Sequence, residues 1–436
     1  MNVANVLGIR YIWIDALCII QDSPGDWVAE SADVYRVYRE SICNIAASDS
    51  TDGSGGLFFQ RETEFIEPLR FTCVLDGVPN TECVLTNGDG MWREELEKSP
   101  LYRRAWVFQE QLLAKRTLHF TRQQIVWECL ECISTEIYTQ GLPRKRLYPL
   151  MSSLRGLIQG ERDVQPSSSI HTTNSDAETI VLEAWTRVVA QYTKCSLSFS
   201  KDKLVAISGI AQPFKERLGE YVAGLWKCYL PFELLWFCDR YLGLPVHRVE
   251  EYIAPSWSWA SIKGPVSYLY IHQAYDRYKQ GVAPWSSVSE VEVQLRPGSK
   301  FEVQNGSLRI RGRLALFSFT DLGEGYGKMD SIQNIGPDEL NLPQLTYNAT
   351  TTSQSSRSLA SLMFDNIEDG QEQQHGEPLL FCMAISARTE PAHHVMGLVI
   401  RRVREDTFRR IGVFDTQNPD AHQAMERLDD HTITII

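Results

Sequence analysis

The feature that most constrains the fold is a strand, helix, strand pattern within the first 50 residues. Tyr11–Ile14 is a short apolar run that ends on Asp15, as expected for a strand buried on both faces of a parallel sheet. Ser23–Asp26 then supplies an N-cap, a proline suited to the first helical turn and an acidic residue at the positive end of the helix dipole. Ile42–Ala47 has the composition of a second buried strand. The sequence therefore predicts a β-α-β unit, the repeating element of a parallel α/β sheet.

Two further patterns complete the N-terminal region. Apolar runs on either side of Asp76-Gly77 predict a β-hairpin, because this dipeptide favours the tight turns that join antiparallel strands. Ser99-Pro100 opens a second helix, and the runs Thr117–Phe120 and Ile125–Glu128 return to strand. We expect these elements to complete one α/β domain over residues 1–135.

The rest of the chain changes character twice. Polar residues 164–178 predict a linker or loop, and apolar stretches predict helices within Ala184–Tyr192, Lys201–Phe214 and Tyr221–Tyr241. After Ser287, apolar and polar residues alternate as in strands, while the polar stretches within 346–377 predict surface loops or disorder. The predicted architecture is an α/β N-terminal domain with a partial parallel sheet, a mainly α-helical middle over residues 136–285 and a β-rich C-terminal region over 286–436.

Composition narrows the class of protein. The 436 residues carry 43 Lys+Arg against 55 Asp+Glu, a net charge of −12 that disfavours a general nucleic-acid-binding surface. No apolar run reaches the ~18 residues that a membrane-spanning helix needs, so we expect no integral membrane segment. The ten cysteines are scattered rather than densely spaced, which favours reduced thiols in an intracellular protein.

Asp15 is the first candidate for a functional side chain. A carboxylate at the carboxyl end of a buried parallel strand lies where open α/β sheets bind their ligands, and partial burial would perturb its pKa. The alternative is a structural role, in which Asp15 caps the following loop by accepting backbone N–H bonds. The sequence leaves both interpretations open and slightly favours the structural one.

A second candidate lies in the helix that follows Pro100. Arg103, Trp106 and Glu110 are spaced i, i+3 and i+7, so a continuous helix would present a cation, an indole and a carboxylate on one face. Such a face could hold a planar or phosphorylated ligand, with Arg104 and Gln109 flanking it. The alternative, which we favour, is that these side chains pack against a neighbouring domain.

Cys129 and Cys132 form a C-x-x-C motif ten residues after His119. A structural zinc site needs four ligands, usually from two such motifs, and the chain has no second one, so we predict no metal site. A redox-active motif normally opens a helix after a strand, whereas this one follows Ile125–Glu128 in what looks like a continuing strand. The sequence therefore favours buried structural thiols.

Several ordered blocks resemble the fungal heterokaryon incompatibility (HET) domain. The blocks are Leu7–Asp22 with Trp27 and Tyr38, Asn44–Ser48, Gly55–Phe58 with Arg61, Arg103–Glu110 with Leu112-Leu113, and Arg116–Phe120. Within them, the motif and ligand-face candidates are Trp13, Asp15, Gln21, Asp22, Gly55, Gly56, Arg103, Arg104, Trp106, Gln109 and Glu110. Gln111 and Lys115 differ from the residues that are commoner in the family at those positions.

The resemblance implies a cytoplasmic fungal protein of allorecognition and innate immunity, whose HET domain triggers programmed cell death when genetically different hyphae fuse. It also implies a remote similarity to Toll/interleukin-receptor (TIR) domains, which agrees with the β-α-β unit. The expected partners are other proteins of an incompatibility system, including further copies of the chain, and not nucleic acid.

The family pattern begins with a strand and a helix ahead of the segment that resembles Leu7–Arg10, and this chain starts after both. We therefore expect a HET domain that is truncated at its N-terminus, and predict that these 436 residues alone do not execute the full death response. Growth arrest on expression of these residues would contradict that prediction.

The resemblance leaves three functional hypotheses. The first is a signalling and interaction module without a cofactor. The second is a TIR-like hydrolase with NAD as its substrate, in which Asp15 or Glu110 would stabilise the oxocarbenium-like centre formed when the nicotinamide bond breaks. The third is a decayed relative without activity.

Overall fold

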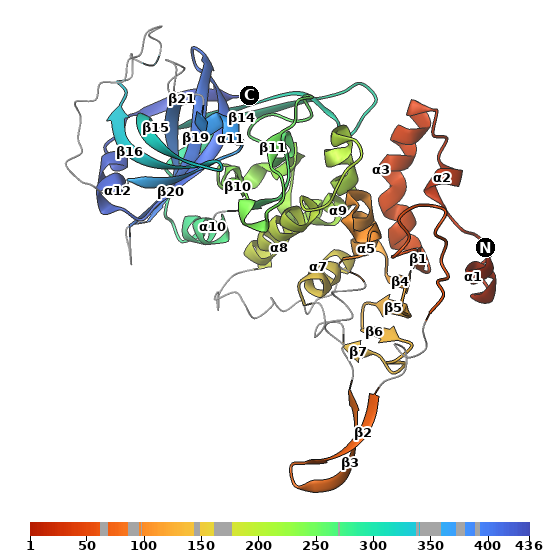
Figure 1. The fold of residues 1–436 in the computed structure, drawn as a ribbon. Coiled ribbons are helices and arrows are strands. Elements are labelled where there is room, and N and C mark those ends of the chain that lie inside the picture. Colours follow the sequence, from red (N-terminus) through yellow and green to blue (C-terminus); the bar gives the residue numbers. More distant parts are fainter. Residues whose placement is uncertain are drawn as a thin grey trace. The chain divides into compact units, whose positions relative to one another are not determined.

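The fold of residues 1–436 is given by a computed structural model (Figure 1). The structure describes all residues except 62–68, 86–95, 97, 144–148, 161–176, 269–270, 337–339, 341–358, 372–379 and 389–392. The chain divides into two compact units. The first comprises Met1–Thr172, Cys195–Leu197 and Val205–Pro213, and the second comprises Thr173–Lys194, Ser198–Leu204 and Phe214–Ile436.

The first unit begins with three helices, α1 (Asn2–Val6), α2 (Asp15–Cys18) and α3 (Pro24–Glu40). The predicted start of the long helix is confirmed, because the Ser23 hydroxyl oxygen accepts the N–H of Asp26 at 3.3 Å and Pro24 occupies the first turn. Ser31 and Val34 are three residues apart on α3 and are both buried.

The predicted strand Tyr11–Ile14 is wrong. These residues form no strand, and Tyr11 and Ile14 keep 82% and 37% of their surface exposed. Asp15 consequently begins the short helix α2 instead of ending a strand. A strand exists only where a neighbouring strand takes up its N–H and C=O groups, and an apolar run cannot reveal whether such a neighbour is present.

The first unit contains a mixed five-stranded sheet in the order β1-β4-β5-β6-β7. Its strands are β1 (Asn44–Ala46), β4 (Arg116–Phe120), β5 (Ile125–Cys129), β6 (Cys132–Thr135) and β7 (Leu142–Pro143). β1 and β4 are parallel, with Ile45 opposite Leu118, and all other neighbours are antiparallel. The parallel pair confirms an α/β N-terminal domain, with β1 joined to its parallel partner through a later helix, α5 (Ala105–Leu113).

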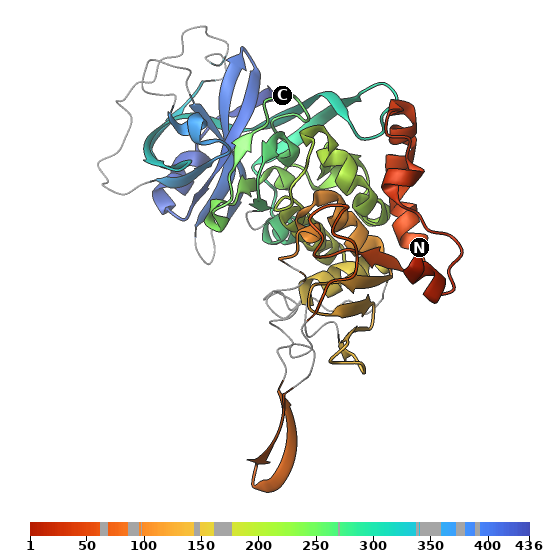
Figure 2. The same ribbon diagram turned by 45° about the vertical axis from the view of Figure 1, so that its right-hand side comes forward.

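The predicted hairpin is confirmed as β2 (Leu69–Leu75) and β3 (Val78–Leu85), a separate two-stranded sheet (Figure 2). Asp76 and Gly77 both have positive φ, 49° and 80°, as a two-residue type I′ turn requires. The described part of this unit also contains η3 (Leu101–Arg103), α5 and α7 (Pro149–Gln159).

The middle of the chain is helical, as predicted, but not throughout. Its long helices are α8 (Ala177–Tyr192) and α9 (Lys203–Leu218), followed after η4 (Ser200–Asp202) and several short elements by α10 (Ile271–Lys279). The helix predicted within Tyr221–Tyr241 is wrong.

No helix of the described part of the chain is both long and apolar enough to cross a bilayer.

Tyr221–Tyr241 forms short strands and 3₁₀ turns instead. These are β8 (Tyr221–Val222), β9 (Leu225–Trp226), η5 (Lys227–Tyr229), η6 (Phe232–Leu234), β10 (Trp236–Cys238) and η7 (Arg240–Leu242). Gly224 is one reason why this segment forms no helix. Its φ of +98° is a conformation that other residues rarely adopt, and a Cβ there would lie 2.9 Å from the indole nitrogen of Trp259. Pro231 lacks the N–H that a helix interior needs.

The short elements continue with β11 (His247–Arg248), η8 (Trp259–Ser261), β12 (Ile262–Lys263) and β13 (Val266–Tyr268). β8 pairs with β9, β10 with β13, and β11 with β12, each in an antiparallel ladder. Trp226, Trp236, Trp257 and Trp259 are fully buried, so this region holds its irregular backbone around a core of indoles.

The C-terminal region is a large, mainly antiparallel sheet, as predicted. Its strands are β14 (Ser286–Leu295), β15 (Val303–Gly323), β16 (Tyr326–Asn334), β17 (Ala360–Phe364), β18 (Leu380–Arg388), β19 (His394–Arg404), β20 (Thr407–Thr416) and β21 (Asp430–Ile435). The long strand β15 pairs with both β16 and β18, so the path β15-β16-β17-β20-β19-β18 closes on itself as a barrel.

Two predicted loops fall partly outside the described residues. Of the range 346–377, the described part forms β17, α11 (Ile367–Gln371) and the buried Asp365 between them, and residues 346–358 and 372–377 lie outside. Of the predicted linker 164–178, residues 164–176 lie outside, and Ala177 begins α8. The last helix is α12 (Pro419–Glu426).

Candidate functional site

Five residues of the first unit meet where α3 packs against α5, and we call them the Glu110 cluster: Trp13, Asp15, Tyr38, Arg104 and Glu110. The Tyr38 hydroxyl donates a hydrogen bond to the Glu110 carboxylate. The ring of Trp13 stands edge-on to the ring of Tyr38, with centroids 5.9 Å apart and planes at 76°. The helix that starts at Ser23 thus places Tyr38 between the indole and the carboxylate.

The Glu110 carboxyl has an unusual electrostatic environment. Burial is the largest effect and raises its pKa to about 7, and the nearby charge of Asp15 acts in the same direction. The Tyr38 hydroxyl and the Arg104 guanidinium oppose this rise, because both favour the ionised form. Burial, followed by the Glu110 charge, raises the pKa of Tyr38 well above its ordinary value. Glu110 is therefore close to half ionised near neutral pH, as suits a general acid or base.

Asp15 is exposed and follows no strand, so the position and partial burial on which its predicted functional role rested are wrong. One of its carboxylate oxygens accepts the N–H of Ala16 at 2.7 Å, the kind of backbone bond that the structural interpretation predicts, and its charge also acts on Glu110. The exposed Gln21 amide donates to the carbonyls of Asp15 at 3.2 Å and Ile19 at 3.1 Å, and so holds the segment that carries Asp15. Asp22 lies exposed in the turn before α3.

The predicted face of Arg103, Trp106 and Glu110 is wrong, because the helix is interrupted at Arg104. Arg104 is extended, with φ −88° and ψ 130°, and separates η3 from α5. The carbonyl of Arg103 accepts the N–H of Ser196 at 2.6 Å, while the N–H of Ala105 donates to the Ser196 carbonyl at 2.9 Å. Arg103 is exposed at the end of η3, and Arg104 is the arginine that acts on Glu110.

Trp106 and Gln109 have different surroundings on α5. Trp106 is half-buried in the first turn of the helix. Gln109 is buried, and its amide oxygen accepts the backbone N–H of Gly209 at 3.1 Å. A side chain at Gly209 would collide with Gln109 and lie 2.6 Å from the Cβ of Tyr35. Gln109 is thus a packing residue that ties α9 to α5.

Gly55 and Gly56 lie apart from the Glu110 cluster, in the turn after β1. Gly56 has φ +68°, and its carbonyl accepts a hydrogen bond from the Ser50 hydroxyl at 2.5 Å. A Cβ on Gly55 would approach the Ser50 hydroxyl oxygen to 2.9 Å. The two glycines therefore shape this turn.

Sequence reasoning missed a series of polar side chains that contact one another in turn at the sheet: Tyr102, His119, Glu128 and Arg155. The Tyr102 hydroxyl lies 2.5 Å from His119 Nδ1, His119 Nε2 lies 3.1 Å from Glu128 Oε2, and Glu128 Oε1 lies 2.9 Å from Arg155 Nη1. His119, Glu128 and Arg155 are fully buried. The available signal was alternation, because His119 and Glu128 occupy the inward positions of β4 and β5.

The C-x-x-C prediction needs correction. Cys129 ends β5 and Cys132 begins β6, so the motif spans a hairpin turn instead of lying in a continuing strand. Both thiols are half-buried and not fully buried, with their sulfurs 3.8 Å apart. Within the described residues, no group of three or more His, Cys, Asp or Glu side chains is placed to hold a metal ion.

Comparison with known proteins identifies the region that carries the Glu110 cluster. Residues 1–110 match the family model described as "Heterokaryon incompatibility protein (HET)". No curated protein and no solved structure matches the chain. The matched range ends at Glu110 and contains all five residues of the cluster, whereas His119, Glu128 and Arg155 lie beyond it. Residues 1–110 of this chain therefore form a heterokaryon incompatibility (HET) domain.

Proposed function

We propose that the protein is a fungal non-self recognition factor whose HET domain links the fusion of genetically different hyphae to programmed cell death. A HET domain implies a role in heterokaryon incompatibility, and the observation that carries the proposal is its match over residues 1–110. We add to that role, as part of the proposal, that the domain triggers cell death and that this response serves fungal innate immunity. The Glu110 cluster is the part of the domain that we propose transmits the signal.

The proposed partners are other proteins of an incompatibility system, including further copies of this chain. The N-terminal segment supports protein contacts, because Val6, Tyr11, Leu17 and Ile20 all expose more than half of their surface. The net charge of −12 supports partners other than nucleic acid. The scattered spacing of the ten cysteines supports a reducing, cytoplasmic location.

The Glu110 cluster also favours a second candidate function, TIR-like cleavage of NAD. Two carboxylates act on each other there, one half-buried and one exposed, beside two aromatic rings. The ionised carboxylate would stabilise the oxocarbenium-like centre that forms as the nicotinamide bond breaks, and a protonated Glu110 could serve as general acid. NAD would be the substrate and not a cofactor.

Inducible expression in a filamentous fungus tests the first function. The complete genomic reading frame that contains these 436 codons should arrest hyphal growth and admit a vital dye, and Glu110→Gln should abolish both effects. Glu40→Gln is the matched control, since Glu40 is an exposed carboxylate of α3 that lies 3.6 Å from Arg36. No arrest by the wild type at levels matched by immunoblot would contradict the proposed function. Arrest by Glu110→Gln would contradict only the role of the cluster.

Nicotinamide release from NAD by purified protein tests the second function. A catalytic Glu110 predicts a loss of about 100-fold or more in turnover for Glu110→Gln, with unchanged turnover for Glu40→Gln. Absence of nicotinamide release by the wild type at micromolar protein would eliminate this candidate.

A further inference from the structure

The turn between β5 and β6 brings two thiols together on one face of the sheet. Glu128 pairs with Ile133 in the antiparallel ladder, so Cys129 and Cys132 are the next opposite positions. Val126 and Glu128 point inward and are fully buried, whereas Trp127 and Cys129 alternate with them and are half-exposed. Both thiols therefore lie on the outer face, within reach of a small solute.

The surroundings of Cys129 favour its ionised form. The backbone N–H of Cys132 donates to the Cys129 sulfur at 3.5 Å. Burial by itself raises the pKa of Cys129, but the N–H groups of Cys132 and Glu131 and the side chains of Cys132 and Trp127 outweigh burial and lower this pKa below its ordinary value. The turn thus points several donors at one sulfur, and these outweigh the Cys132 carbonyl oxygen, which lies 3.5 Å from the same sulfur and accepts from the protonated thiol.

Cys132 behaves in the opposite way. Burial is the largest cause of its raised pKa, and the neighbouring Cys129 and the Glu131 charge act in the same direction, against a hydrogen bond with Ser134. The sulfur of Cys132 lies 3.8 Å from the Ser134 hydroxyl oxygen. The pair is therefore asymmetric, because the pKa of Cys129 is lowered and the pKa of Cys132 is raised, so Cys129 is the thiol that ionises more readily.

We propose that Cys129 and Cys132 form a peroxide-reactive dithiol that closes to a disulfide across the β5–β6 turn. The sulfurs start 3.8 Å apart. Residues i and i+3 of a tight turn have Cα atoms within about 7 Å, which includes the Cα separations that disulfides span. Rotation of the two side chains can form the bond while the strands stay in register.

Gly141 keeps the chain clear of this pair. A Cβ on Gly141 would lie 3.1 Å from the Cys132 sulfur and 2.9 Å from the Ser134 hydroxyl oxygen, and the φ of +77° also suits glycine. The backbone therefore passes close to Cys132 without a side chain that would block its rotation.

The oxidation proceeds in two balanced steps with hydrogen peroxide as the oxidant. The Cys129 thiolate attacks one peroxide oxygen, the O–O bond breaks, and the leaving hydroxide takes up from the solvent the proton that Cys129 released on ionisation, which gives the first water and a sulfenic acid on Cys129. The Cys132 sulfur then attacks the Cys129 sulfur, the S–O bond breaks, and the leaving hydroxide takes the Cys132 proton as water. Two thiols lose two electrons in total, and one peroxide becomes two waters.

Differential alkylation of the whole chain followed by peptide mass spectrometry tests the proposal. The reduced protein is exposed to hydrogen peroxide in the presence of a chelator, so that metal binding cannot protect the thiols. We expect a Cys129–Cys132 disulfide to form about tenfold faster than the thiol of Cys18 is lost. Cys18 is the internal reference because it is exposed and sits on the separate helix α2.

Two serine variants separate the roles of the thiols. Cys132→Ser should leave a sulfenic acid on Cys129 that a dimedone probe captures, and Cys129→Ser should give no adduct on Cys132. Cys18→Ser is the matched control and should oxidise like the wild type. Oxidation of the pair no faster than Cys18, or equal dimedone labelling of Cys132 in Cys129→Ser, would overturn the proposal. Circular dichroism of each variant verifies that the fold is retained.

Discussion

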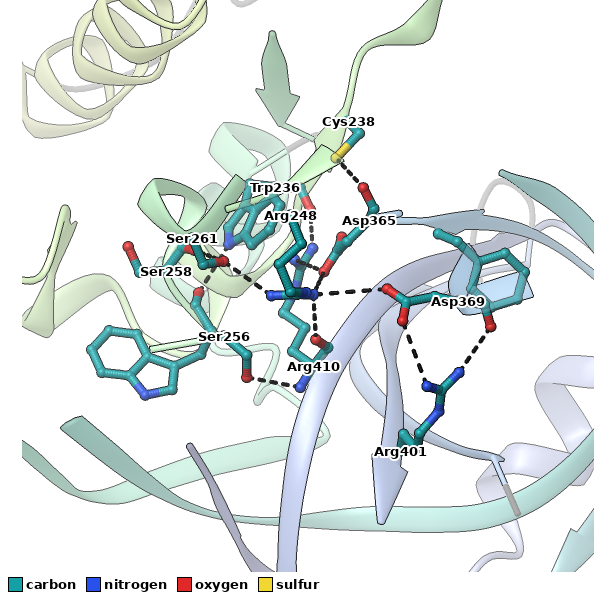
Figure 3. Close-up of polar contacts among 12 residues, drawn as sticks. Trp236, Cys238, Arg248, Ser256, Ser258, Ser261, Asp365, Asp369, Arg401 and Arg410 are labelled. Atoms are coloured by element: carbon teal, nitrogen blue, oxygen red, sulfur yellow. Dashed lines mark hydrogen bonds and ion pairs between the residues drawn. The ribbon is translucent and has the colours of Figure 1, made fainter. Parts of the chain in front are cut away.

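Glu110 of the first unit and Asp365 of the second both have a carboxyl pKa that burial raises, but they differ in which groups favour the ionised form. Asp365 of the second unit is 1% exposed, and its Oδ2 lies 2.7 Å from Arg410 Nη1 and 3.4 Å from Arg248 Nη2 (Figure 3). Glu110 of the first unit is half-buried and is bonded by the neutral hydroxyl of Tyr38. Asp365 thus has two cations in direct contact, whereas Glu110 has a hydroxyl and the charge of the exposed Arg104.

Asp365 and Arg410 are both buried, and Figure 3 shows the polar contacts around them. The guanidinium carbon of Arg410 lies 3.2 Å from the ring centroid of Trp236, and its Nη2 donates to the Trp236 carbonyl. Arg248 also donates to the Arg410 carbonyl at 3.0 Å. Burial still lowers the pKa of Arg410 to about 10, but this value keeps the guanidinium charged at neutral pH.

The difference indicates which carboxylate is available for chemistry. Burial raises the pKa of Asp365 as well, but the charges of Arg410, Arg248 and Arg240 oppose this rise, and the pair of Asp365 with Arg410 joins β17 to β20 and to β10. Burial holds the carboxyl of Glu110 near half ionisation at neutral pH, so its ionised form destabilises the folded state and the group can give up or take up a proton at that pH. The comparison therefore assigns a structural role to Asp365 and keeps Glu110 as the functional candidate.

The largest expected effect is on the structural side. Asp365→Asn leaves the buried charge of Arg410 without its partner, so we expect a loss of about 3–5 kcal/mol in the free energy of unfolding. Urea unfolding at pH 7 measures this loss. The matched control is Asp33→Asn, an exposed carboxylate 3.5 Å from Arg36, which should unfold at nearly the wild-type urea concentration. Equal midpoints for Asp365→Asn and the wild type would remove the structural half of the comparison.

The next effect concerns Glu110 and depends on pH. Its pKa in the folded chain, about 7, lies above the usual 4.5, so the folded state binds the extra proton within that window. The stabilisation is complete below pH 4.5 and is lost as pH rises through 7. Between pH 4.5 and 8, the free energy of unfolding of Glu110→Gln should therefore rise by about 2 kcal/mol relative to that of the wild type, a value reduced because Glu110 is partly exposed. Parallel urea curves for the two proteins at every pH would contradict the raised pKa.

Local chemistry made part of this fold predictable. The start of α3 follows from the Ser23 cap and Pro24, the β2–β3 turn from Asp76-Gly77, and the C-terminal sheet from alternation. In each case neighbours in sequence supply the hydrogen bond, the fixed φ or the period. Tyr11–Ile14 failed because a strand depends on a partner elsewhere in the chain, which an apolar run does not specify.

The candidate site shows the same limit. Asp15 and Glu110 were candidate functional residues and lie within one electrostatic cluster, but Tyr38, which bonds Glu110, was named only as a position of the HET resemblance, with no contact to Glu110 predicted. The spacing argument for Arg103 failed because Ser196, far along the chain, takes the backbone bonds that would continue the helix. Such contacts between distant segments leave no local pattern in the sequence.

A smaller effect tests the hydrogen bond inside the Glu110 cluster. Tyr38→Phe removes the donor to Glu110, so the carboxylate loses a bond that favours its ionised form, and its pKa should rise further. We expect a loss of about 1 kcal/mol in the free energy of unfolding at pH 8, where Glu110 is ionised, and a smaller loss at pH 5. Tyr35→Phe on the same helix is the control. A loss that is equal at both pH values would mean that Tyr38 contributes packing alone.

The smallest effect separates the two neighbouring arginines and tests whether α5 is interrupted. Arg104 lowers the pKa of Glu110 through its charge, whereas Arg103 ends η3. Arg104→Gln should therefore raise the pKa of Glu110, and because Arg104 is exposed the stability should change by no more than about 0.5 kcal/mol. Carbon-13 NMR titration of the glutamate carboxyl groups, with Glu110→Gln to assign the signal, measures the pKa. Arg103→Gln is the matched control and should leave it unchanged. The opposite result would mean that Arg103, and not Arg104, is the cation that acts on Glu110, as a continuous helix would place it.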